Sequence, residues 1–86
     1  MVPEISRFFG IMVFMLYREH NPPHLHARYG DEEVSVEIES GTVTGKMPNR
    51  ALRMVEEWRG AHQAELLENW NSSRARRTLN RIESLE

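Results

Sequence analysis

The sequence predicts an α+β domain, in which a small, mostly antiparallel sheet of four to five strands in the N-terminal half packs against one long or kinked C-terminal helix. Two observations predict this class. Between residues 5 and 46, apolar residues form short runs or alternate with polar ones, as they do in strands. Between residues 48 and 72 they recur every three or four positions, which is typical of an amphipathic helix. Strands followed by a helix favour a helix layered on one face of the sheet.

Length and composition bound the organisation of the chain. Its 86 residues suit one domain, 1–86, with 1–47 as the sheet region, 48–72 as the helix and 73–86 as a flexible basic tail. There is no cysteine for a disulfide, and the longest apolar run, 11–17, has seven residues, whereas a membrane-spanning helix needs about 20. The first residues lack the basic-then-apolar pattern of a signal peptide. We therefore expect a cytoplasmic protein that does not enter a membrane.

The first two strands are expected on either side of Gly10, at residues 5–9 and 11–17. The continuous apolar run of the second suits a strand that is covered on both faces. The segment Asn21-Pro22-Pro23 follows, and its two prolines exclude both a helix interior and a central strand. We expect a loop with a stiff backbone there.

A hairpin is predicted around Gly30-Asp31. Residues 24–29 and 32–39 alternate between apolar and polar side chains, and glycine accepts the positive φ at the first position of a two-residue loop. Such a loop pairs residues whose numbers sum to 61, so that Leu25 meets Val36 on the apolar face. The apolar faces of the two strands then agree.

The polar face of this hairpin brings histidines beside acidic residues. The expected pairs are His24 with Glu37, His26 with Ser35 and Arg28 with Glu33. A four-residue loop would instead pair His26 with Glu37 and His24 with Glu39. In both registers the histidines lie beside carboxylates.

A short edge strand is expected at 42–46, and Pro48 suits the first turn of the helix. The apolar stripe of this helix comprises Ala51, Val55, Trp58, His62, Leu66 and Trp70. Gly60 costs a helix about 1 kcal/mol relative to alanine. We therefore expect either a kink in one helix or two abutting helices at this position.

The residues best suited to metal binding or catalysis are His20, His24 and His26. Zinc takes three or four nitrogen, sulfur or oxygen ligands, so one hypothesis is a zinc site formed by these histidines, with Glu37 as a further ligand. A second hypothesis is a metal-independent ribonuclease, because histidines act as general acids and bases near neutral pH; His24, His26 and Glu37 would be catalytic and Arg28 would clamp a phosphate. A third is that the histidines are hydrogen-bonded framework residues of a polar sheet face.

A basic patch follows the helix. It consists of Arg74, Arg76, Arg77 and Arg81, with no acidic residue between Asn69 and Ile82. Because the guanidinium group suits phosphates, one hypothesis is that these arginines bind RNA. The alternative is that they belong to a solvated C-terminal segment.

Four segments carry a family resemblance: Pro3–Gly10, His20–Ala27 with its Pro-Pro-His-x-His element, Pro48–Leu52 and Glu68–Trp70. Together they resemble the small bacterial domain-of-unknown-function family numbered 4160, through about Trp70. The resemblance assigns no activity and no catalytic residue. Members look like components of two-gene loci of the toxin–antitoxin type, which implies a small partner protein encoded nearby and a toxin-like or partner-binding role.

Overall fold

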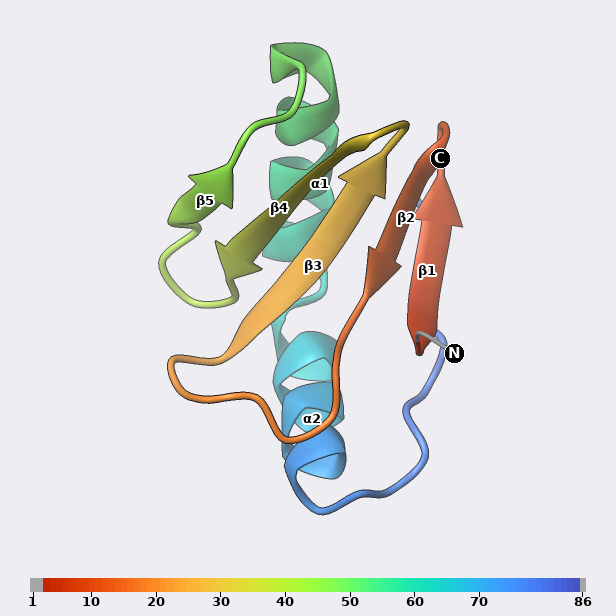
Figure 1. Cartoon of the computed structure of the whole chain (residues 1–86). Coiled ribbons are helices and arrows are strands. Elements are labelled where there is room, and N and C mark those ends of the chain that lie inside the picture. The colour runs from red at the N-terminus through yellow and green to blue at the C-terminus, as the bar shows by residue number, and fades with distance from the viewer. Residues whose placement is uncertain (1–2, 86) are drawn as a thin grey trace.

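Five antiparallel strands followed by two helices make up the protein, in a computed structural model that describes residues 3–85 (Figure 1). The strands are β1 (Glu4–Phe8), β2 (Ile11–Phe14), β3 (His24–Tyr29), β4 (Glu32–Glu37) and β5 (Val43–Gly45), and they are neighbours in the sheet in chain order. The helices are α1 (Asn49–Ala61) and α2 (Gln63–Arg74). The predicted α+β class and the antiparallel sheet of the N-terminal half are confirmed.

The register predicted for the β3–β4 hairpin is also confirmed. Leu25 pairs with Val36, and His24 pairs with Glu37, so that the paired numbers sum to 61 throughout. Gly30 adopts a φ of 63° at the first loop position, a conformation that glycine reaches without a steric penalty.

The second strand is shorter than the apolar run that predicted it. β2 ends at Phe14, and the chain then leaves the sheet while Met15 stays fully buried in the core. The strand is nevertheless covered on both faces. Ile11 and Val13 are buried in the core, and Phe14 on the opposite face is buried beneath a stacked His26 ring.

The helical region is two abutting helices, because α1 ends at Ala61 and α2 begins at Gln63. The break is at His62, two residues after Gly60, and the backbone of His62 is not helical, with a φ of −128°. The buried stripe nevertheless continues across the break from Trp58 to Leu66. The prediction of one long or kinked helix is therefore roughly, but not fully, correct.

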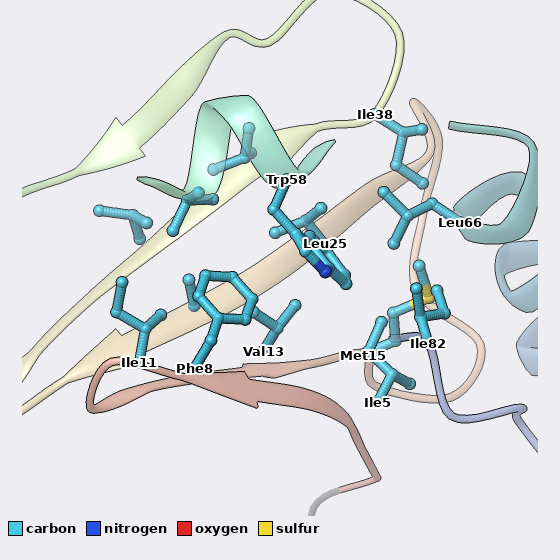
Figure 2. Close-up of a cluster of buried hydrophobic side chains, with 14 of the residues drawn as sticks. Ile5, Phe8, Ile11, Val13, Met15, Leu25, Ile38, Trp58, Leu66 and Ile82 are labelled. Atoms are coloured by element: carbon cyan, nitrogen blue, oxygen red, sulfur yellow. The ribbon is translucent and has the colours of Figure 1, made fainter. Parts of the chain in front are cut away.

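A hydrophobic core fills the space between the helices and one face of the sheet (Figure 2). Trp58 reaches from α1 into its centre, and its ring centroid lies 5.5 Å from that of Phe8. The other labelled members are Ile5, Ile11, Val13, Met15, Leu25, Ile38, Leu66 and Ile82. Neither of the two helices described for residues 3–85 has the length and apolarity needed to cross a membrane.

The segment after α2 runs back towards β1 without forming a helix or strand (Figure 1). We predicted a flexible tail over 73–86, but Ser73 and Arg74 complete α2, and Ile82 is buried in the core with its N–H donating to the Ile5 carbonyl at 2.8 Å. Leu79 and Leu85 also pack against the core, but three apolar residues in a stretch rich in arginine and other polar residues were interpreted as a solvated tail, which is why the sequence did not predict this docking. Glu86 lies outside the described residues.

Candidate functional site

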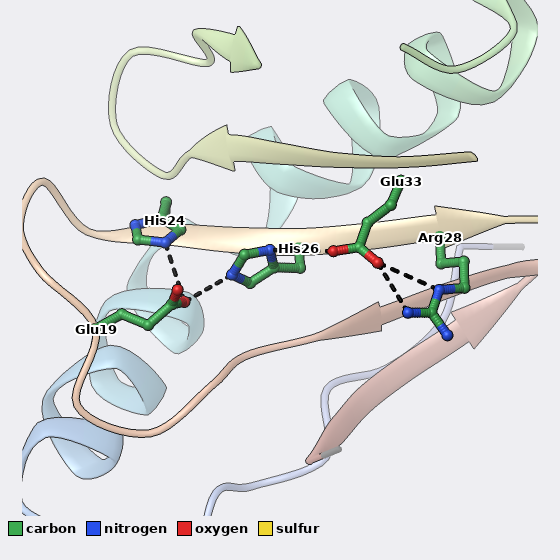
Figure 3. Close-up of polar contacts among 5 residues, drawn as sticks. All are labelled: Glu19, His24, His26, Arg28 and Glu33. Atoms are coloured by element: carbon green, nitrogen blue, oxygen red, sulfur yellow. Dashed lines mark hydrogen bonds and ion pairs between the residues drawn. The ribbon is translucent and has the colours of Figure 1, made fainter. Parts of the chain in front are cut away.

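Three polar side chains meet at the start of β3 (Figure 3). His24 opens this strand and His26 lies two residues further, so both project from the same sheet face, the one opposite to the face of Leu25. The third, Glu19, belongs to the loop 15–23 that connects β2 with β3. Arg18, directly before it, adopts a left-handed conformation with a φ of 62°. We call Glu19, His24 and His26 the His–Glu cluster.

Both imidazoles of the His–Glu cluster approach the same carboxylate oxygen. Glu19 Oε1 lies 3.0 Å from His24 Nε2 and 2.6 Å from His26 Nε2. The side chains are only partly exposed, at 18% for His24, 12% for His26 and 24% for Glu19. The cluster is therefore shielded from bulk water on most sides but can still be reached from outside.

A backbone carbonyl accepts a hydrogen bond from His24. Its Nδ1 lies 2.9 Å from the Pro22 oxygen, and because a carbonyl oxygen only accepts, Nδ1 must carry the proton of that hydrogen bond. In a neutral imidazole Nε2 then carries a lone pair and no proton, and this nitrogen faces the carboxylate of Glu19. Two such acceptors face each other favourably only when a cation, either a proton or a metal ion, lies between them. Histidines that bind metals have this same arrangement, with the other ring N–H donated to a carbonyl.

Aromatic rings pack against both histidines. The Phe14 ring stacks on His26 with centroids 5.1 Å apart, and the Trp70 ring of α2 lies 5.2 Å from His24. These contacts limit the rotation of the imidazoles and exclude water from one side of each. The rings are therefore held ready for a ligand by the sheet and by α2.

A second carboxylate links the cluster to Arg28. Glu33 Oε2 lies 3.8 Å from His26 Nδ1, and Glu33 Oε1 forms an ion pair of 2.8 Å with the Arg28 guanidinium (Figure 3). Arg28 also lies over the Phe14 ring, 5.7 Å from its centroid. Its charge is therefore already partnered by Glu33.

The structure brings together some of the residues that the sequence selected and leaves others apart. Glu37 pairs with His24 in the register, but its carboxylate accepts a hydrogen bond of 2.8 Å from the Ser40 hydroxyl. His20 is exposed, and the potential metal ligands found together within residues 3–85 are Glu19, His24 and His26. Glu19 was missed, although it stands directly before His20; strand alternation cannot predict which loop side chain folds over a sheet.

The basic residues at the C-terminal end are engaged in different ways. Arg81 pairs with Glu4 at 2.9 Å, and Arg74 lies over the Trp70 ring, 5.9 Å from its centroid. Arg76 and Arg77 are exposed. Two of the four arginines expected to be free for RNA thus have partners within the protein.

A family model described as "Domain of unknown function (DUF4160)" matches residues 10–71. The match covers well over half of the chain and confirms the resemblance. The chain belongs to the DUF4160 family. All three residues of the His–Glu cluster lie within the part that matches DUF4160, as does the hairpin that positions the histidines, whereas β1 and the segment after α2 lie outside it. No curated protein and no solved structure matches the chain.

Proposed function

We propose that this protein is a binding module for a divalent transition-metal ion, best suited to zinc, with Glu19, His24 and His26 as its ligands. The observation that carries the proposal is the orientation of His24, whose Nδ1–H is donated to a carbonyl while Nε2 faces a carboxylate. Two imidazoles and one carboxylate are a zinc ligand set that leaves a fourth position for water or another ligand. Imidazole ligands favour transition metals over magnesium and calcium, which prefer oxygen.

The spacing of the ligand atoms sets a condition for this proposal. Ligands 2.0–2.1 Å from a tetrahedral ion lie about 3.3 Å from one another, so the 2.6 Å contact between Glu19 and His26 must lengthen by about 0.7 Å when the ion enters. Glu19 lies in a loop and has a flexible side chain, whereas both histidines are held on β3. We expect Glu19 to be the residue that moves.

The same geometry argues against the ribonuclease hypothesis. A phosphate cleaved by two histidines has to lie between them, but the carboxylate of Glu19 occupies that place and would repel it. The other proposed parts are also engaged elsewhere, since Arg28 pairs with Glu33 and Glu37 accepts from Ser40. A metal ion, by contrast, is attracted by the carboxylate.

The role expected from the family resemblance is not assigned to any surface of the molecule. A toxin-like or partner-binding half of a two-gene module is compatible with a metal site, because the His–Glu cluster occupies one end of the sheet alone. We also propose a cytoplasmic location and a contact with RNA through Arg76 and Arg77.

A thermal-unfolding experiment with zinc and with a chelator tests the metal proposal. Zinc at about one hundred times its Kd should stabilise the protein by about 2.7 kcal/mol, and the chelator should reverse this gain. The double variant His24→Ala/His26→Ala should show no zinc response. His62→Ala is the matched control, because His62 forms a comparable contact with Glu65 at 2.6 Å away from the cluster, and it should respond like wild type. If zinc leaves wild type unchanged, or stabilises the double variant equally, the metal proposal is wrong.

A further inference from the structure

The turn between β1 and β2 has an unusual residue for its conformation. Phe8 pairs with Ile11, so Phe9 and Gly10 form a two-residue loop, and their φ angles are 48° and 80°. Positive φ at both positions defines a type I′ turn, in which Asn, Asp or Gly is preferred at the first position. A phenylalanine there is a conformational outlier. Its side chain is 61% exposed, so burial in the core does not offset the strain.

Phe9 stands at the rim of a hollow of about 360 Å³. The hollow, which we call the Phe9 pocket, is lined by Phe9, Tyr29, Pro48, Arg50, Ala51 and Met54. The β1–β2 turn, the end of β3 and the start of α1 meet at this end of the sheet, opposite the end where β3 begins with the histidines (Figure 1). Tyr29 is 40% exposed, so two aromatic rings face solvent beside one apolar depression.

The charges around the Phe9 pocket restrict what can bind there. Arg50 is its one charged lining residue, and within residues 3–85 it forms no ion pair. Asp31 and Glu32, close in sequence to Tyr29, are exposed acids, and the exposed Lys46 lies beside Glu32 at the hollow that adjoins the pocket at Pro48. A polyanion such as RNA would meet both of these acids, whereas a peptide can place one carboxylate on Arg50 and none elsewhere. The charge pattern therefore favours a protein segment.

We propose that the Phe9 pocket docks an amphipathic segment of a partner protein. An apolar side chain of that segment packs against Phe9, Tyr29 and Met54, and a neighbouring Asp or Glu binds the Arg50 guanidinium. A small molecule fits less well, since small-molecule sites bury 70–90% of the ligand surface and this rim is open. An exposed aromatic beside an arginine is typical of the residues that dominate binding at protein interfaces. The strained position of Phe9 is then explained by binding, because strain is commonly kept where function requires it.

Selection from a phage-displayed library of random peptides on the immobilised protein tests this proposal. We expect enrichment of peptides with an aromatic or branched apolar residue close to an Asp or Glu. Their affinity should fall about tenfold or more in Phe9→Asn and in Arg50→Glu, as for residues at the centre of an interface. Tyr17→Ala removes another exposed aromatic and Arg76→Glu reverses another exposed arginine, and both should bind within about twofold of wild type.

The choice of variants keeps the outcome clear. Phe9→Asn relieves the turn, so its Tm should rise while peptide binding is lost, and misfolding cannot then account for the loss. No enrichment over the bare support, or binders that Phe9→Asn retains at wild-type affinity, would overturn the proposal. A fluorescent single-stranded RNA that binds wild type and is lost in Phe9→Asn would also overturn it, in favour of a nucleic-acid surface. None of these outcomes depends on the metal proposal.

Discussion

Replacing Trp58 with alanine should remove a large part of the stability of the fold. The side chain is fully buried and touches Phe8 and His62, with ring centroids 5.5 and 5.4 Å away. Truncating a buried tryptophan costs about 3–5 kcal/mol, because transfer free energy is lost and a cavity remains. A chain of 86 residues has a total stability of only about 4–13 kcal/mol. Trp58→Ala should therefore lose between about a quarter and all of this stability and unfold at a much lower urea concentration than wild type.

Urea unfolding followed by circular dichroism measures this loss, and Trp58→Phe provides its control. Phenylalanine keeps an aromatic ring in the core but cannot donate the hydrogen bond of 2.8 Å that Trp58 Nε1 gives to the Glu83 carbonyl. One such bond contributes about 1 kcal/mol, so Trp58→Phe should cost about 1–2 kcal/mol. A loss below about 1 kcal/mol in Trp58→Ala would mean that this helix stripe does not face the core, and would refute the packing described above.

Three further predictions concern the turn, the C-terminal segment and pH. Phe9→Asn should raise the free energy of unfolding by about 1 kcal/mol in urea titrations, since a left-handed conformation costs most side chains about 1–2 kcal/mol; a decrease would contradict the strained turn. Asn69→Ala should cost about 1–3 kcal/mol and open residues 75–85 to proteolysis, because the buried Asn69 amide both donates to and accepts from the Asn80 backbone at 2.8 Å; unchanged proteolysis would contradict the docking of this segment. The hydrogen bond from Arg7, followed by that from Arg81, lowers the pKa of Glu4 below its ordinary value of 4.5, so its stabilising effect is full above that value and disappears as the pH falls through the folded pKa. Wild type and Glu4→Gln should then differ by less than about 1 kcal/mol at pH 6 in urea unfolding, and this difference should shrink as the pH falls through the folded pKa. A difference that grows towards low pH would contradict this.

The elements that the sequence predicted best are those governed by strict local patterns. Alternation on both sides of Gly30 determined the faces of β3 and β4, because a shift by one residue would expose Leu25 and Val36, and the two-residue loop at Gly30-Asp31 set their register. The stripe from Ala51 to Trp70 likewise predicted the helical face that is buried. The exact place of the helix break was open, since Gly60 weakens a helix without determining where it ends.

Of the candidate site, the sequence predicted the two strand residues but not the loop residue, because a strand has a strict local pattern and a loop does not. His24 and His26 lie on a strand, and their common face follows from alternation. Glu19 lies in a loop, where the direction of a side chain depends on individual backbone angles such as the left-handed φ of Arg18. The docking of Ile82 was equally hidden, because it depends on single long-range contacts with the Ile5 backbone and the core.

Zinc binding by Glu19→Gln and by His20→Ala, measured with isothermal titration calorimetry on the full chain, tests the central proposal most directly. The two residues are neighbours in the sequence, but only Glu19 contacts His24 and His26. We predict one zinc ion per chain in wild type, unchanged affinity in His20→Ala, and an affinity at least about tenfold weaker in Glu19→Gln. Equal binding by Glu19→Gln and wild type, or a loss of binding in His20→Ala instead, would contradict the assignment of the His–Glu cluster as the metal site.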